Sequence, residues 1–127
     1  MSPPGAPAAA GYYVPAVRTG DLLFCSGQIP LDHATGELVG AGAAEQAARC
    51  LDNLAAVCAG VGATLADAVK ITIYLTDLEG SFAEVNELYS TYFPAGPPAR
   101  VAIGVSALPR GAQVEIDAVV AIPRSAS

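Results

Sequence analysis

The segment VKITIYLT, residues 69–76, alternates apolar and polar side chains along its whole length. Val69, Ile71, Ile73 and Leu75 fall on one side of an extended chain, and the residues between them fall on the other. This period of two, in a run rich in β-branched residues, predicts a strand with one buried face. The rest of the fold is built around this strand.

Amphipathic helices are predicted on both sides of the strand. Before it, apolar residues recur at helical spacing over 43–61, with Gly60 near the end as a stop signal. After it, Ser81 and Glu84 match a capping box at the start of a second helix, which Pro94 ends. The apolar face of this second helix is predicted to comprise Phe82, Val85, Leu88, Tyr89 and Tyr92.

Further strands are predicted at 14–18, 21–25, 100–105 and 113–122. The order is therefore β-β-α-β-α-β-β. It indicates an α+β fold in which two helices cover one face of a mixed sheet of about five or six strands. The second face of this sheet carries too few charges to be stable in water, and we expect another subunit to cover it.

Composition narrows the class of protein. The 127 residues are 53% hydrophobic and only 14% charged, which excludes a disordered chain. Six Lys and Arg stand against 12 Asp and Glu, and the resulting net charge of -6 argues against nucleic-acid binding. No apolar run reaches the roughly 20 residues of a membrane span.

The ends of the chain suggest its organisation. Residues 1–11 are rich in Pro, Gly and Ala without a cation, and are predicted to be a flexible tail rather than a signal peptide. A single domain is expected over 12–123, with a short C-terminal tail at 124–127. The lack of an export signal and the odd number of cysteines predict reduced thiols in the cytoplasm. The single histidine, His33, has no companion ligands, so no metal is expected.

Arg100 is the first candidate for a functional residue. It follows the run PPA (97–99) at the entry to a predicted strand, where its guanidinium can hold a carboxylate through two parallel N–H donors. Glu115 and Asp117 share one face of the last predicted strand, and the pattern allows Arg100 to lie on that same sheet face. Two interpretations stay open on spacing alone: a structural salt bridge, or an acid/base group beside an anion clamp.

A series of short motifs extends through nearly all of residues 11–122. They are SGQIPLD (26–32), TGELV (35–39), Gln46, LDNL (51–54), VK (69–70), FAEVNELY (82–89), PAR (98–100), LPRGA (108–112) and VEI (114–116). Their order and combination resemble the Rid/YjgF family. The resemblance implies a chorismate-mutase-like fold with two helices on one face of a mixed sheet. It also implies a homotrimer whose three sheets pack into a barrel, with sites in the clefts between subunits.

The resemblance implies an activity as well. Enamine/imine deaminases of this family hydrolyse reactive 2-imino acids, such as 2-iminopropanoate and its tautomer 2-aminoacrylate, to 2-oxo acids and ammonia without a cofactor. By resemblance, Arg100 binds the substrate carboxylate and Glu115 positions or activates water. The other substrate-binding residues implied are Tyr13, Ser26 and Asn86 through their side chains, with Gly27 and Ala102 through their backbone groups.

The chain departs from the family pattern close to Arg100. Val101 stands where the family often has Ser or Thr, and Ala102 stands where it often has Cys, so no thiol at that position is essential here. The loop at 94–98 is also shorter than in well-studied members. These differences leave the pocket size and the choice of substrate open.

Alternatives to this deaminase stay open. The same fold is compatible with deamination of a different substrate, such as another aminoacrylate or an aminomuconate. It is also compatible with a non-catalytic trimer that binds small carboxylates as a ligand sensor or in a chaperone-like role. Ribonuclease activity has been ascribed to relatives, but the acidic balance and the lack of a basic stripe disfavour it.

Overall fold

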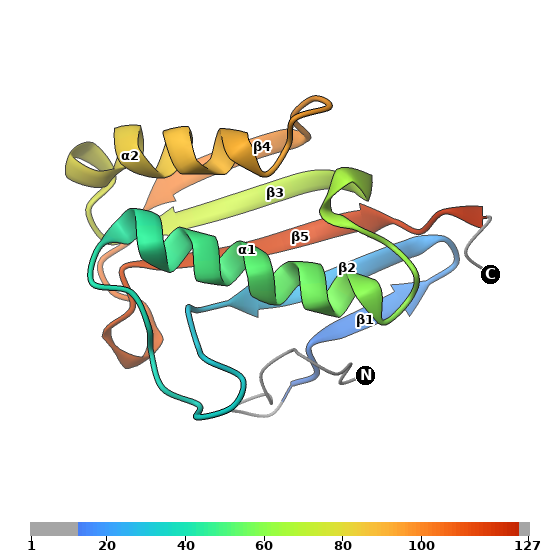
Figure 1. Cartoon of the computed structure of the whole chain (residues 1–127), viewed down its shortest axis with the longest axis horizontal. Helices are drawn as coiled ribbons and strands as arrows, with labels where there is room; N and C mark the ends of the chain where they lie inside the picture. The colour runs from blue at the N-terminus through green and yellow to red at the C-terminus, as the bar shows by residue number, and fades with distance from the viewer. Residues whose placement is uncertain (1–12, 125–127) are drawn as a thin grey trace.

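Five strands form one mixed sheet in the part of the chain that the structure describes, residues 13–124. The computed structural model orders these strands β1-β2-β5-β3-β4 (Figure 1), and the predicted order of strands and helices along the chain is confirmed. The strands are β1 (Ala16–Thr19), β2 (Leu22–Gln28), β3 (Ala68–Leu75), β4 (Ala99–Gly104) and β5 (Val114–Ala121). The helices are α1 (Ala43–Ala59) and α2 (Leu78–Thr91), and short 3-10 turns occur at Leu65–Asp67 and Pro109–Gly111.

The last strand, β5, lies in the middle of the sheet. It pairs antiparallel with β2 on one side and with β3 on the other, and every second residue from Val114 to Val120 is buried. β3 pairs parallel with β4, so α2 is the crossover between them. The β1–β2 hairpin turns at Gly20, whose φ of 59° lies in the left-handed region that glycine accepts most easily.

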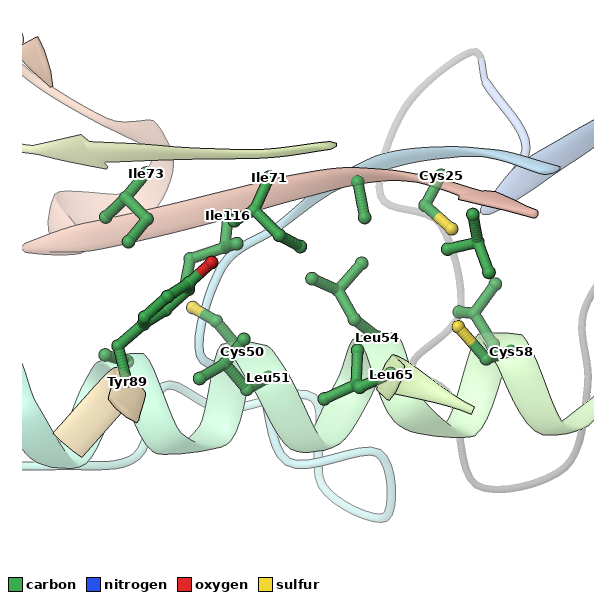
Figure 2. Close-up of a cluster of buried hydrophobic side chains, with 14 of the residues drawn as sticks. Cys25, Cys50, Leu51, Leu54, Cys58, Leu65, Ile71, Ile73, Tyr89 and Ile116 are labelled. Atoms are coloured by element: carbon green, nitrogen blue, oxygen red, sulfur yellow. The ribbon is translucent and has the colours of Figure 1, made fainter. Parts of the chain in front are cut away.

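Both helices cover the same face of the sheet (Figure 1), and α1 packs against β5, β2 and α2. The layer between α1 and the sheet is apolar (Figure 2). Its fully buried side chains include Leu51, Leu54, Ile71, Ile73 and Ile116. Burial of one such side chain contributes roughly 1.5–3 kcal/mol, so this layer is the main source of stability.

Two buried polar residues of α1 hold the loop that precedes the helix. Asn53 Nδ2 donates to the Leu31 carbonyl at 3.0 Å. Gln46 Nε2 donates to the Gly40 carbonyl at 3.1 Å, and its Oε1 accepts from the Gln113 N–H at 2.8 Å. Because buried amides need such partners, these two motif residues serve the architecture of the loop.

The second helix begins one turn earlier than predicted. Asp77 is its N-cap, and the Asp77 carboxylate accepts a hydrogen bond from the Gly80 N–H at 3.1 Å. The capping box predicted at Ser81 is therefore wrong, because Asp77 is an equally strong capping residue and lies one turn closer to the end of β3.

Two residues predicted to face the core lie largely outside it. The buried side chains of α2 are spaced four residues apart and include Val85 and Tyr89. Phe82 lies at the edge of this buried row and is 37% exposed. A register shift at the start of β3 lifts Val69 out of the buried row, so that it is 46% exposed.

The face of the sheet away from the helices, called the open face below, is apolar over much of its area, as predicted. Val17, Phe24, Val101 and Ile103 point to this face and are between 39% and 56% exposed. Packing of the open face against other subunits stays a prediction.

All three cysteines are free and buried. Cys25 of β2 and Cys58 of α1 face each other across the core (Figure 2), and a hydrogen bond between their thiols, together with burial, raises the pKa of Cys25. Burial also raises the pKa of Cys50. Since the thiolate is the reactive form, Cys25 and Cys50 are poor nucleophiles.

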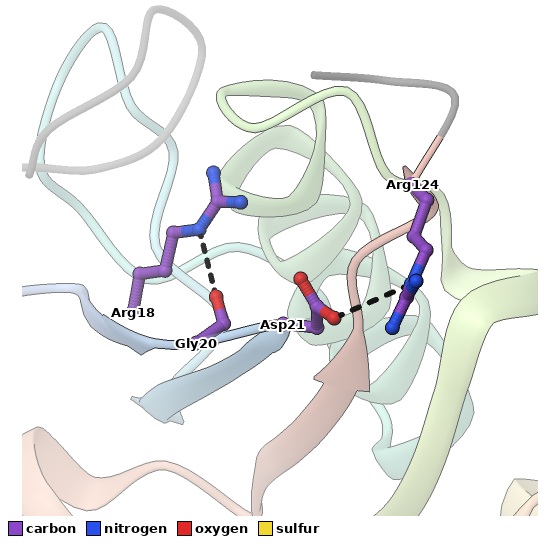
Figure 3. A network of polar contacts seen from close by, with 4 residues as sticks. All are labelled: Arg18, Gly20, Asp21 and Arg124. Atoms are coloured by element: carbon purple, nitrogen blue, oxygen red, sulfur yellow. Dashed lines mark hydrogen bonds and ion pairs between the residues drawn. The ribbon is translucent and has the colours of Figure 1, made fainter.

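Polar contacts join the end of the described chain to the first hairpin (Figure 3). Arg124 Nε lies 3.7 Å from the Asp21 carboxylate, and Arg18 Nε donates to the Gly20 carbonyl at 3.1 Å. The Arg124 and Asp21 side chains are exposed, so their ion pair contributes at most about 1 kcal/mol.

Some of the predictions concern residues outside this description. The N-terminal tail at 1–11, Tyr12, and residues 125–127 of the C-terminal tail lie outside the described residues. Within 13–124, neither helix combines the length and the apolar character needed to cross a membrane.

Candidate functional site

Arg100 lies on the helix-covered side of β4, an edge strand of the sheet. Its Nη1 donates to Asn86 Oδ1 at 2.6 Å, and its guanidinium carbon lies 5.5 Å from the centroid of the Phe82 ring and 5.0 Å from that of Tyr89. These three partners repeat at helical spacing on α2, so one helix face holds the cation through a hydrogen bond and two cation–π contacts. A guanidinium has five N–H donors, so it can also bind a carboxylate.

A pocket of about 470 Å³ opens beside Arg100, between α2, β4 and the loop that joins them. Its walls are mainly apolar, and its size suits a small organic ligand. The proline-rich loop noted in the sequence forms one wall. The lining residues are Asn86, Tyr89, Ser90, Phe93, Pro97, Pro98 and Arg100.

Glu115 lies on the open face, directly opposite Tyr74 of β3, and is half-buried. On its other side, β2 has an irregularity between Cys25 and Gln28 that brings Gly27 against the Glu115 carboxylate. A Cβ atom at position 27 would overlap this carboxylate, so only glycine fits there without moving the glutamate. The structure thus brings together two of the predicted site residues, Gly27 and Glu115.

A second carboxylate, that of Asp117, lies on the same face of β5 as Glu115. The Tyr74 hydroxyl donates to Asp117 Oδ2 at 3.0 Å. Burial first, and then the negative charge of Asp117, raise the pKa of Glu115 above its ordinary value. Burial and the bond to Asp117 likewise raise the pKa of Tyr74. A carboxyl group with a raised pKa is suited to proton transfer near neutral pH.

Arg100 and Glu115 lie on opposite faces of the sheet, so the shared face that the sequence allowed is wrong. Arg100 pairs with Ile71, whose side chain is buried under the helices, whereas Glu115 pairs with Tyr74 on the open face. β3 lies between their two strands, so the backbones of β4 and β5 are about 10 Å apart across the sheet. The prediction failed because alternation within one strand does not reveal the register between strands. In a single chain, these two groups do not reach the same small ligand.

The remaining predicted residues have separate surroundings. Ser26 Oγ donates to the Val14 carbonyl at 2.6 Å, and the Ser26 N–H donates to the Pro15 carbonyl at 2.8 Å. The serine thus fixes the segment that carries Tyr13, whose side chain is half exposed. Ala102 lies on the same side of β4 as the arginine and is half-buried.

Two tyrosines at these places were not predicted as site residues. Tyr74 is the aromatic residue among the polar positions of β3, and this placement was the available signal in the sequence. The Tyr89 ring packs 4.7 Å from the Phe93 ring beside the pocket. Its buried hydroxyl points toward the core near Cys50 (Figure 2) and has no hydrogen-bond partner among the described residues. Nothing in the sequence pattern marks this last feature.

The residues around His33 form a turn that the Asp32 side chain stabilises. Asp32 Oδ1 accepts the N–H groups of Ala34 at 2.8 Å and Thr35 at 3.1 Å, and these bonds lower the pKa of Asp32. Among residues 13–124, no three His, Cys, Asp or Glu side chains gather as they would around a metal ion.

Comparisons with known proteins agree with this architecture. The family model described as Endoribonuclease L-PSP matches residues 4–122. The RutC family protein y4sK of Sinorhizobium fredii is 50% identical over 92% of this chain and 92% of its own length. The 2-iminobutanoate/2-iminopropanoate deaminase of Mus musculus is 44% identical over 90% of this chain and 84% of its own length.

Solved structures agree as well. The crystal structure of RidA from an Antarctic Psychrobacter species has a TM-score of 0.88 and 41% identity, and the match covers 93% of this chain and 94% of that one. The α+β fold expected from the sequence is therefore the fold of solved Rid proteins. The chain belongs to the Rid/YjgF family, which the Endoribonuclease L-PSP model describes.

Proposed function

We propose that this protein is a deaminase that hydrolyses small 2-imino acids, of the 2-iminobutanoate and 2-iminopropanoate type, to 2-oxo acids and ammonia. The observation that carries the proposal is the clamp on Arg100, which Asn86 and two aromatic rings hold beside a pocket of about 470 Å³. Every such substrate has a carboxylate next to the C=N carbon, and a guanidinium binds carboxylates through paired N–H donors. The mouse relative named for this reaction supports the same substrate class.

The proposed reaction adds water across the C=N bond and releases the nitrogen. Water attacks the carbon of the protonated imine while the Glu115 carboxylate takes up a proton from that water, which gives a tetrahedral carbinolamine. Glu115 then returns the proton to the nitrogen and the C–N bond breaks. The hydroxyl then gives its proton to the departing ammonia as it becomes the oxo group, so the nitrogen leaves as ammonium and Glu115 is again a carboxylate. One water is consumed and nothing is oxidised or reduced, so acid/base transfer and orientation are sufficient.

We place the active site between two copies of the chain. Arg100 and Glu115 lie on opposite faces of one sheet, two strands apart, so a single ligand meets both only when they come from different subunits. The apolar open face, where Val101 and Ile103 are exposed, supports such an association. The expected assembly is a homotrimer with a site in each of its clefts.

The other residues take supporting roles in this proposal. Asn86 positions the clamp through Arg100, and Gly27 leaves room for the catalytic carboxylate. Tyr13 and the backbone groups at Gly27 and Ala102 contact the substrate. Ser26 acts through the segment that it holds, because its hydroxyl already donates to the Val14 carbonyl.

The test is a coupled assay. An L-amino-acid oxidase generates the imino acid from alanine or 2-aminobutanoate, and its decay is followed in the presence of this protein. Wild type is expected to accelerate the decay, and Arg100→Ala to lower kcat/KM by about 10²-fold or more. Arg18→Ala is the matched control, because Arg18 lies on β1 at the opposite edge of the sheet. It is expected to keep the wild-type rate.

Decay no faster than in buffer, across several side chains, would contradict the deaminase. Saturable binding of 2-oxobutanoate that is lost in Arg100→Ala would then favour a carboxylate-binding trimer without turnover. RNA cleavage is not proposed, because a chain with a net charge of -6 lacks the cations that bind phosphates.

A further inference from the structure

The open face is mainly apolar, but a polar group lies around Glu115, and Lys70 and Thr72 of β3 lie on the same face. Glu115 and Asp117 point to this face from β5, and Tyr74 points to it from β3. Tyr74 is the direct cross-strand neighbour of Glu115, but its hydroxyl donates a hydrogen bond to Asp117 at 3.0 Å. The polar group therefore has an internal order: the tyrosine holds the aspartate, and the aspartate lies beside the glutamate.

We propose that Tyr74 and Asp117 form a positioning pair that orients the Glu115 carboxyl and controls when it gives up its proton. The inference rests on the proposed function, in which Glu115 carries a proton between water and the imine nitrogen. Neither residue of the pair is expected to touch the substrate, so both act through Glu115.

The physical basis is repulsion between like charges on one strand. Residues i and i+2 of a strand lie on the same side, about 7 Å apart, and two carboxylates so placed resist ionising together. The bond from Tyr74 fixes the direction of the Asp117 carboxylate beside Glu115. Burial first, and then this neighbouring negative charge, raise the pKa of Glu115, so Glu115 gives up its proton less easily.

Few other charged groups lie near Glu115. On β3, Tyr74 faces it directly, whereas the cation Lys70 lies opposite Val119, closer to Asp117 than to Glu115. On β2 the facing residue is Gly27, which has no side chain. From α1, on the other side of the sheet, comes the Cys50 thiol; burial first, and then the Glu115 charge, raise the pKa of Cys50 and so favour its neutral form. On β4 the open-face residues are Val101 and Ile103, which carry no charge.

The polar side chains of Tyr74, Glu115 and Asp117 are unfavourable in a face that is expected to be covered by another subunit. Burying charged groups between subunits costs free energy unless they are paired. A purely structural face would gain from apolar residues at 74 and 117. Polar residues at these two positions are therefore expected to serve the glutamate.

Two readouts test the pair in the full-length protein. The first is the pH dependence of kcat/KM, and the second is a 13C NMR titration of the Glu115 carboxyl, which needs no turnover. Asp117→Asn removes the negative charge, so Glu115 ionises more easily. The acid limb and the NMR midpoint are both expected to move to lower pH, by roughly one pH unit. Asp117→Glu restores the charge and is expected to return both toward wild type.

Tyr74→Phe keeps the charge but releases the carboxylate. We expect kcat/KM to fall by roughly 10-fold, with a smaller displacement of the limb than in Asp117→Asn. Thr72→Val is the matched control, because Thr72 is the direct cross-strand neighbour of Asp117 and carries no charge. It is expected to move neither readout.

The two proposals fail in different ways. An active wild type whose limb and Glu115 titration are unmoved by Asp117→Asn would overturn the positioning pair and leave the deaminase intact. An inactive wild type whose Glu115 titration moves as expected would remove the deaminase and keep the control of this proton by Tyr74 and Asp117.

Discussion

Two variants that are each inactive are expected to restore activity when they share an oligomer. Arg100→Ala removes the clamp and Glu115→Gln removes the proton carrier, but each chain keeps the group that the other has lost. The two groups lie on opposite faces of the sheet and two strands apart, so in the proposed assembly each site takes them from different subunits. In a three-fold ring every mixed trimer regains one of its three sites, so isolated mixed trimers are expected to show about a third of wild-type activity.

The assay uses two affinity tags. The variants are produced together, mixed oligomers are isolated by successive capture of both tags, and imine decay is followed as for wild type. A pair made of Arg100→Ala and the Arg100→Ala/Glu115→Gln double variant is the control, because no chain in it has the arginine. If verified mixed oligomers show no activity above that control, the site lies within one chain and the reasoning from opposite faces is refuted.

Other substitutions test single contacts. Gly27→Ala displaces the carboxylate on β5 and is expected to lower kcat by about 10²-fold, and an unchanged kcat would show that this close approach is unimportant. Asn86→Ala leaves the Arg100 guanidinium unheld and is expected to raise KM by roughly 10-fold with little change in kcat; an unchanged KM would count against the clamp. Asp77→Ala is expected to lower the free energy of unfolding by about 1 kcal/mol in urea titrations, and no loss would mean that the helix is capped otherwise. Tyr89→Phe removes a buried hydroxyl without a described partner, so Tm is expected to stay the same or rise; a clear fall would reveal a partner for this hydroxyl.

The elements and their order were predictable because periodicity reflects burial directly. Ile71, Ile73 and Leu75 alternate in the sequence and are buried in the structure, and Leu51 and Leu54 mark the buried stripe of α1 in the same way. The apolar open face was predictable for a related reason, since a chain with 14% charged residues cannot surround every surface with charge.

The errors arose where two local signals compete or where strands must be aligned. Asp77 and Ser81 both fit a helix N-cap, and only the geometry after β3 selects the first. The faces of Arg100 and Glu115 depend on the register of two different strands with β3, which no single segment encodes. The bond between Tyr74 and Asp117 joins residues that are far apart in the chain, so it too was out of reach.

Of the five described strands, the one that completes the sheet is the last to be synthesised. Until β5 (Val114–Ala121) emerges, the β1–β2 hairpin and the β3–β4 pair have no strand between them, and β2 and β3 each expose an unpaired backbone edge. Such edges recruit other chains during synthesis. A nascent chain released before residue 114 therefore has two half-sheets without their common centre. It is expected to aggregate or to be degraded, and not to persist as a partly active fragment.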